Sequence, residues 1–144
     1  MSAPIVTVLV VDDRPDVRLS LLYMLEACGY GIVEAADGHQ AMAAVAKGQV
    51  DVVLADLYMP SMDGVGLVRA IRSRPVAQPR IILMTGSYHL EQDISRGALE
   101  QIGADAILLK PFNRETLVQT IERVTYRPSD DPHTAKRYAS DHIR

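Results

Sequence analysis

Acidic, hydroxyl and amino side chains follow short apolar runs of the sequence. In chain order these polar residues are Asp12, Asp13, Asp56, Thr85 and Lys110. Carboxylate oxygens without a nearby His or Cys favour Mg²⁺ over a transition metal, and Mg²⁺ readily bridges carboxylate and phosphate oxygens. A lysine suits a phosphate oxygen, and a carboxylate can act as a nucleophile. Brought together, these groups could perform phosphoryl transfer, with Asp56 as the central candidate.

The segments that carry these residues alternate between two sequence patterns. Short, continuously apolar runs are typical of strands covered on both faces, and segments of helical periodicity follow each of them. The runs are Ile5–Val11, Ile32–Val33, Val52–Ala55, Ile81–Met84 and Ala106–Leu109, and the helical segments are 15–28, 38–47, 64–73, 89–102 and 113–126. Five such units predict an α/β fold with a parallel sheet, right-handed crossovers and helices on both faces. We expect the flavodoxin-like, doubly wound form with strand order 2-1-3-4-5.

This strand order brings the polar residues to one edge of the sheet. Taken singly they have structural explanations, because Asp12 and Asp13 could cap the helix that begins near Pro15. Thr85 and Lys110 could simply end their strands. Asp56 is harder to explain in this way, since it follows a strand expected to be buried on both sides.

Composition narrows the classes of protein. The chain has 144 residues and a net charge of −3, which gives no indication of direct nucleic-acid binding. No segment is long and apolar enough to predict a membrane span, and we expect a cytoplasmic protein. The lone cysteine, Cys28, is predicted to be a small core residue. The proline-containing, mixed-charge segment 127–144 is interpreted as a mobile tail or linker stub after a domain over 1–126.

Four motifs resemble the receiver domains of two-component response regulators. They are VVDD (10–13), DLYMPSMDG (56–64), MTG (84–86) and KPF (110–112), in this order and at the ends of predicted strands. The resemblance extends over about residues 5–126. It implies a phosphorylation-activated signalling switch rather than an enzyme with an external substrate.

The resemblance also implies a role for each matching position. Asp56 would accept a phosphoryl group from the phosphohistidine of a histidine kinase or histidine phosphotransfer protein. Lys110 would pair with the phosphoryl oxygens, Thr85 would move inward to bond them, and the backbone N–H groups of Tyr58 and Gly86 would complete the cradle. The peptide bond after Lys110 would be cis.

For magnesium, the resemblance implies a ligand set around the same aspartate. Asp13, Asp56 and the backbone carbonyl of Tyr58 would ligate Mg²⁺, with Asp12 acting on the ion through water. Asp63, followed by Gly64, predicts a turn instead of a further acid of the site. The Tyr58 ring either shields the aspartyl phosphate and lengthens its lifetime, or simply faces solvent.

Three positions depart from the pattern of the family. Ile107 stands where the family usually has an aromatic residue that couples to the threonine. The 25-residue spacing between Thr85 and Lys110 is longer than expected. Gly86 replaces the more usual alanine.

The output is expected to be a downstream protein contact or self-dimerisation through 89–126. An alternative is a receiver-like interaction module that works without phosphorylation. A Mg²⁺-dependent phosphatase with an aspartyl-phosphate intermediate is a further alternative, disfavoured because Tyr58 stands where such enzymes have a second Asp.

Overall fold

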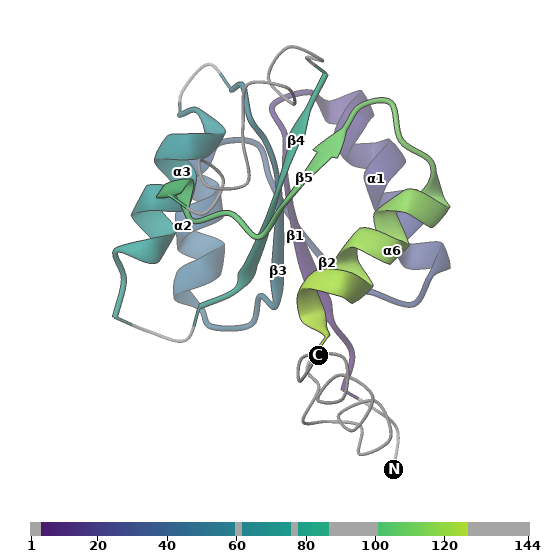
Figure 1. Ribbon diagram of the computed structural model, residues 1–144, viewed down its shortest axis with the longest axis horizontal. Helices are drawn as coiled ribbons and strands as arrows, with labels where there is room; N and C mark the ends of the chain where they lie inside the picture. The colour runs from purple at the N-terminus through teal and green to yellow at the C-terminus, as the bar shows by residue number, and fades with distance from the viewer. Residues whose placement is uncertain (1–3, 60–61, 76–77, 87–100, 127–144) are drawn as a thin grey trace, which may run out of the picture.

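The sheet of the computed structural model, which describes residues 4–59, 62–75, 78–86 and 101–126, contains five parallel strands. Their order is β2-β1-β3-β4-β5, which confirms the predicted doubly wound, flavodoxin-like arrangement (Figure 1). The strands are β1 (Thr7–Val11), β2 (Gly31–Ala35), β3 (Val52–Asp56), β4 (Arg80–Thr85) and β5 (Ala106–Leu109). Asp56 and Thr85 are therefore the last residues of β3 and β4.

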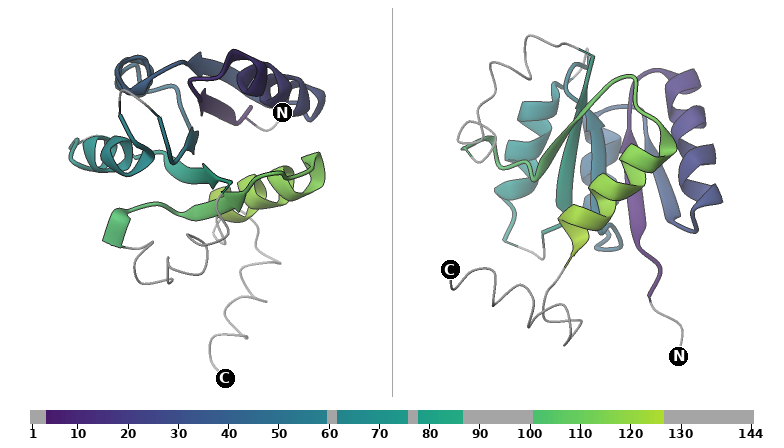
Figure 2. Two further views of the ribbon diagram at one scale, coloured as in Figure 1. Left: turned by 90° about the horizontal axis from the view of Figure 1, so that it is seen from above. Right: turned by 45° about the vertical axis from the view of Figure 1, so that its right-hand side comes forward.

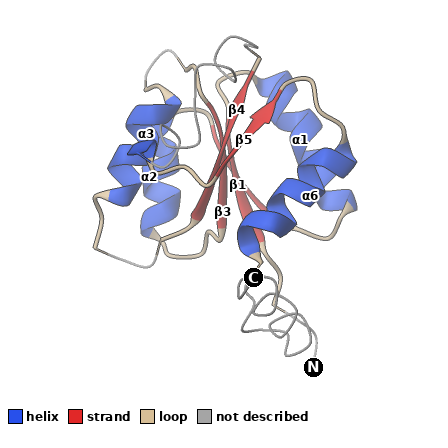
Figure 3. Ribbon diagram, in the orientation of Figure 1, coloured by secondary structure: helices blue, strands red, loops and turns tan. Residues whose placement is uncertain are grey.

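Two helical layers cover the sheet. The helices are α1 (Pro15–Ala27), α2 (Gly38–Ala46), α3 (Gly64–Arg72) and α6 (Arg114–Thr125). Figures 1 and 3 show α1 and α6 on one face and α2 and α3 on the other, and the view from above in Figure 2 shows the sheet between them. The helix predicted over 89–102 lies mostly outside the described residues, although 101 and 102 are helical.

The continuous apolar runs are explained by burial on both faces. Leu9, Val53 and Ile81 point to the layer of α2 and α3, whereas Val10 and Leu54 point to the layer of α1 and α6. All five side chains are completely buried. Because successive strand residues point to opposite faces, a strand that is covered twice has no position for a polar side chain except at its ends.

Side chains at the starts of α3 and α6 act as N-caps. The Asp63 carboxylate accepts a hydrogen bond from the Gly66 N–H at 2.6 Å and caps α3, which agrees with its prediction as a turn residue. Asn113 caps α6 through the Thr116 N–H, at 2.8 Å. The prediction that Cys28 belongs to the core is wrong: it is exposed because α1 ends at Ala27, beyond the last buried residue of that helix.

Two aspartates accept hydrogen bonds at the amino-terminal edge of the sheet, where the strands begin. Asp51 accepts a hydrogen bond from the Thr7 N–H at 2.8 Å. Asp105 accepts one from the Ile81 N–H at 2.8 Å and one from the Arg72 guanidinium at 2.9 Å. These carboxylates therefore join the strand beginnings to each other and to the end of α3.

None of the helices in the described ranges combines the length and the apolar composition that crossing a lipid bilayer requires.

Candidate functional site

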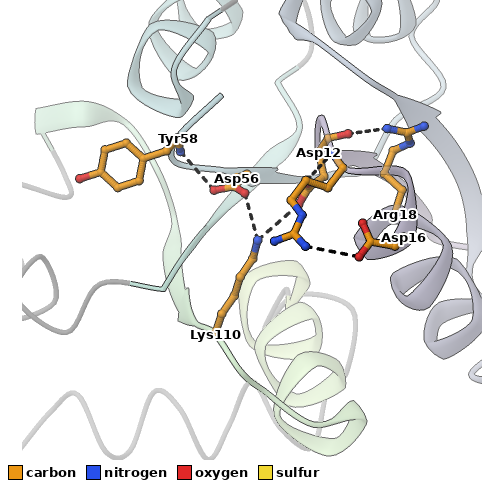
Figure 4. Close-up of polar contacts among 7 residues, drawn as sticks. Asp12, Asp16, Arg18, Asp56, Tyr58 and Lys110 are labelled. Atoms are coloured by element: carbon orange, nitrogen blue, oxygen red, sulfur yellow. Dashed lines mark hydrogen bonds and ion pairs between the residues drawn. The ribbon is translucent and has the colours of Figure 1, made fainter. Parts of the chain in front are cut away.

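The polar residues singled out from the sequence converge at the carboxyl-terminal edge of the sheet, where the strands end (Figure 4). Asp12 directly follows β1, Asp56 ends β3, Thr85 ends β4 and Lys110 directly follows β5. The Lys110 N–H donates to the Thr85 carbonyl at 2.7 Å, which holds the ends of these two neighbouring strands together. The strand order alone thus brings side chains about a hundred residues apart in the sequence within contact.

Three carboxylates form the centre of this edge. Each of Asp12, Asp13 and Asp56 offers an oxygen, and these oxygens lie within 4.8 Å of one another. Asp12 is completely buried, Asp56 is partly buried and Asp13 is exposed. Like charges at this separation repel, so the arrangement is favourable only with a countercharge.

Lys110 supplies part of that countercharge. Its Nζ lies 3.0 Å from Oδ2 of Asp56 and 3.3 Å from Oδ2 of Asp12. One ammonium group bridging two of three carboxylates leaves a net negative site. The Lys110–Pro111 peptide bond is cis, as the resemblance implies.

The carboxylate cluster fits the requirements of Mg²⁺. This ion prefers oxygen ligands at about 2.1 Å in octahedral geometry, so ligands on opposite sides of it are about 4.2 Å apart. The three carboxylate oxygens lie within 4.8 Å of one another, so only a small adjustment would let one ion contact all three, and the cluster contains no sulfur or imidazole ligand. The donor set therefore matches a hard divalent cation.

Tyr58 contributes its backbone to the site while its ring points elsewhere. The Tyr58 N–H donates to Oδ1 of Asp56 at 3.1 Å. The residue is 59% exposed, and Figure 4 shows its ring directed away from Asp56 and Lys110. The ligand role of its carbonyl and the shielding role of its ring stay predictions.

Thr85 and Gly86 differ in their surroundings. Thr85 is completely buried, whereas Gly86 is exposed, and a Cβ added to Gly86 would have no atom within 4 Å. The backbone at Gly86 is thus open to the approach of a group from solvent.

Helix capping does not account for the presence of Asp12 and Asp13 after β1. The N-cap of α1 is Arg14, which makes no side-chain capping bond. Asp12 Oδ1 accepts a hydrogen bond from the Arg14 N–H at 2.9 Å, and its other oxygen faces Lys110. The buried Asp12 carboxylate therefore contacts Lys110 at the carboxyl-terminal edge of the sheet as well as the backbone at the start of α1.

The structure describes Ile107, one of the positions that depart from the family pattern, but only part of the longer segment between Thr85 and Lys110. Ile107, on β5, is half-buried and packs against the core beneath α2 and α3. The additional length between Thr85 and Lys110 falls within 87–105, of which 87–100 lies outside the described residues.

One contact of the site was missed by reasoning from sequence. The guanidinium of Arg18, on α1, donates to the backbone carbonyl of Asp12 at 2.7 Å, and its Nε lies 3.4 Å from Glu34 Oε1 on β2. The only signal in the sequence is an arginine one turn into the helix that follows the acidic pair. That position alone does not distinguish it from a solvated helix residue.

Comparisons with known proteins point to one family. The family model described as the response regulator receiver domain matches residues 8–122. A protein of Rhizobium etli described as probable chemotaxis protein CheY is 33% identical over 120 residues, which cover 83% of this chain and 92% of that protein. The gliding motility regulatory protein of Myxococcus xanthus is 35% identical over 119 residues, covering 82% of this chain and only 15% of that longer protein.

A solved structure shows the same fold. The response regulator protein TrrA of Thermotoga maritima, in complex with Mg²⁺ and BeF, is 32% identical and superimposes with a TM-score of 0.71, covering 83% of this chain and 99% of that one.

Proposed function

The chain belongs to the family of response regulator receiver domains, and from this premise we propose that Asp56 is its phosphoryl acceptor. The donor is the phosphohistidine of a histidine kinase or histidine phosphotransfer protein. Receiver domains are signalling domains, so the transfer serves to switch the conformation of this chain and not to process a metabolite.

The observation that carries this proposal is the mismatch of charge at the carboxyl-terminal edge. Three carboxylates lie within 4.8 Å of one another, and Lys110 is the lysine that contacts two of them. A site with surplus carboxylates and one ammonium group is suited to take up a divalent ion and a phosphoryl group. When bound, Mg²⁺ neutralises charge on the phosphoryl oxygens, and Asp12, Asp13, Asp56 and the Tyr58 carbonyl would hold it.

The transfer step uses the Asp56 carboxylate as nucleophile. One carboxylate oxygen forms the new bond to phosphorus while the phosphorus–nitrogen bond of the donor breaks, and the electron pair of that bond stays on the imidazole nitrogen. Lys110, already 3.0 Å from this carboxylate, faces the negative charge that the phosphoryl oxygens bring. Attack of water on phosphorus later returns the free carboxylate and releases inorganic phosphate.

The acyl phosphate then acts as a local charge change that biases a two-state element. We assign the response to Thr85, at the end of β4, with the N–H groups of Tyr58 and Gly86 as further donors to the phosphoryl oxygens. The output surface is 89–126, of which α6 and β5 are described, and its partner is a downstream protein or a second copy of the chain. We place this domain, over 1–126, in the cytoplasm, with 127–144 as tail or linker.

A small phosphodonor with Mg²⁺ tests the proposal without a kinase. The intact mass of the wild type should increase by one phosphoryl group, and Asp56→Asn should abolish the increase. Asp51→Asn is the matched control, because it removes a carboxylate from the opposite edge of the sheet, and it should be modified like the wild type.

Three results would count against the proposal. An unmodified wild type would favour the phosphorylation-independent interaction module. Equal modification of Asp56→Asn would place the acceptor elsewhere. Repeated turnover of a phosphomonoester would indicate the phosphatase.

A further inference from the structure

We propose that Arg18 positions the Asp13 carboxylate for Mg²⁺ by holding the peptide group between Asp12 and Asp13. This inference rests on the proposed Mg²⁺-dependent function and assigns a positioning role to a residue outside the ligand set. Figure 4 shows the Arg18 side chain reaching back from α1 to the Asp12 backbone.

Asp12 is fixed by its own contacts. Its N–H donates to the Ala35 carbonyl at 3.2 Å, Oδ1 accepts from the Arg14 N–H at 2.9 Å, and Oδ2 faces Lys110 Nζ at 3.3 Å. Its side chain is completely buried. The Asp12 carboxylate is therefore held by groups other than Arg18.

Asp13 has no comparable support. It is exposed, and within the described ranges no hydrogen bond or ion pair reaches its carboxylate. The direction of this side chain is then set mainly by the backbone torsions at Asp12 and Asp13, which turn when the peptide group between them turns. A ligand held only by its backbone places its oxygen precisely only if that backbone is held.

Arg18 provides this restraint. Its Nη1 donates to the carbonyl oxygen of that peptide group at 2.7 Å, a charge-assisted hydrogen bond. Its side chain is only 17% exposed, and Nε faces Glu34 Oε1 on the neighbouring strand β2 at 3.4 Å. The guanidinium is thus braced between two strands and fixes the peptide plane that leads into Asp13.

Charge and geometry predict opposite effects of removing Arg18. A guanidinium beside a cation site repels the cation, so losing the charge alone would strengthen Mg²⁺ binding. Losing the hydrogen bond frees the peptide group and weakens binding. The sign of the change therefore separates positioning from electrostatics.

The test measures Mg²⁺ binding by calorimetry without any phosphodonor. Arg18→Met removes both charge and hydrogen bond and should weaken Mg²⁺ affinity by about 10-fold, the lower end of the loss seen when residues behind metal ligands are removed. Arg18→Lys keeps the charge but replaces the planar guanidinium with a compact ammonium group. Its Mg²⁺ affinity should therefore lie between those of Arg18→Met and the wild type. Arg14→Met is the matched control, because it removes the same charge from the start of the same helix. The Arg14 side chain is 66% exposed and, among the described residues, forms an ion pair with Asp16 alone, so this variant should not weaken binding.

Further readouts separate this role from a general loss of structure. Unfolding midpoints without Mg²⁺ show whether Arg18→Met is folded, and Glu34→Gln, which loosens Arg18 without removing it, should show a smaller loss of affinity. Phosphorylation of Arg18→Met should return to the wild-type rate at saturating Mg²⁺, since Asp56 and Lys110 are untouched.

Unchanged or tighter Mg²⁺ binding by Arg18→Met would overturn the inference while leaving the phosphoacceptor role of Asp56 intact. A wild type that binds no Mg²⁺ would overturn both. A wild type that binds Mg²⁺ but is never phosphorylated would overturn the proposed function alone.

Discussion

The two edges of the sheet use aspartates in opposite ways. At the amino-terminal edge, Asp105 faces two guanidinium groups, with Arg72 at 2.9 Å and Arg80 at 3.6 Å, and also accepts the Ile81 N–H. At the carboxyl-terminal edge, three carboxylates lie together, and the ammonium group of Lys110 contacts two of them, Asp12 and Asp56. Two guanidinium groups thus face the single carboxylate of Asp105, whereas three carboxylates lie around the single ammonium group at the other edge.

We interpret this difference as one between carboxylates that stabilise the fold and carboxylates proposed to carry the function. A carboxylate surrounded by N–H and guanidinium donors is satisfied, and it stabilises the protein by linking elements. A carboxylate that repels its neighbours is tolerated where an ion or ligand later completes the site. Four variant comparisons examine this contrast, beginning with the one for which we expect the largest effect.

Removing the cation at each edge should affect chemistry at only one of them. Lys110→Ala should slow phosphorylation of Asp56 by about 100-fold, a loss typical of removing one charge-stabilising donor. It should not weaken Mg²⁺ binding, because the carboxylates remain and a positive charge beside them is removed. Arg80→Ala, at the opposite edge, should be phosphorylated at the wild-type rate. Rates from phosphodonor time courses check this, and equal losses of phosphorylation and Mg²⁺ binding in Lys110→Ala would contradict the role assigned to it.

Removing an aspartate at each edge should change stability in different directions. Asp105→Asn should lower the free energy of unfolding by about 1–2 kcal/mol, since hydrogen bonds to charged groups in a partly buried setting are lost. Asp56→Asn should not destabilise the metal-free protein, because the lost contact with Lys110 is offset by relief of repulsion. Urea unfolding without Mg²⁺ measures both. The contrast between the edges fails if Asp56→Asn is as destabilising as Asp105→Asn.

Two glycines extend the comparison to the backbone. Gly103, near the amino-terminal edge, has φ +98°, and a Cβ there would lie 3.2 Å from Arg72 Cγ. Gly103→Ala should therefore cost about 1 kcal/mol. Gly86→Ala, in open space without a positive φ, should stabilise the protein by about 0.5 kcal/mol and leave phosphorylation unchanged. Thermal and urea unfolding check both, and loss of phosphorylation in Gly86→Ala would show that the open backbone itself is needed.

The smallest effect is expected at Tyr58. Because its ring is exposed and directed away from Asp56, Tyr58→Ala should leave the rate of dephosphorylation near that of the wild type. Following the loss of the acyl phosphate over time measures this. Markedly faster dephosphorylation of the variant would instead support shielding of the phosphoryl group by the ring.

Most of the fold could be predicted because its signals are local. Runs such as Val52–Ala55 are apolar throughout since both faces of the sheet are covered, and Asp63 and Asn113 cap the helices that follow them. Once the strand order is inferred, topology alone brings Asp12, Asp56 and Lys110 together. The prediction for Cys28 is wrong because helical periodicity does not show where burial along a helix ends, and the last buried residue of α1 is Leu25.

The rest of the site depends on contacts that leave no pattern in the sequence. Arg18 lies on α1 with a side chain that turns back to a backbone carbonyl, and carbonyl partners have no signature in residue type. The exposed orientation of Tyr58 and the packing of Ile107 into the core are likewise set by tertiary neighbours. The resemblance predicted the candidate ligands, whereas the contacts of Arg18 became visible only in the structure.

The most direct measurement of the central claim is the free energy of unfolding with and without Mg²⁺ and beryllium fluoride, a mimic of the aspartyl phosphate. A ligand pair that completes the carboxyl-terminal edge should stabilise the wild type by about 2.7 kcal/mol at a concentration 100 times its Kd. Asp56→Asn should lose the stabilisation by beryllium fluoride, and Asp105→Asn should keep it despite its lower starting stability. Equal stabilisation of the wild type and Asp56→Asn, or none in either, would contradict the assignment of Asp56 as the phosphoryl acceptor.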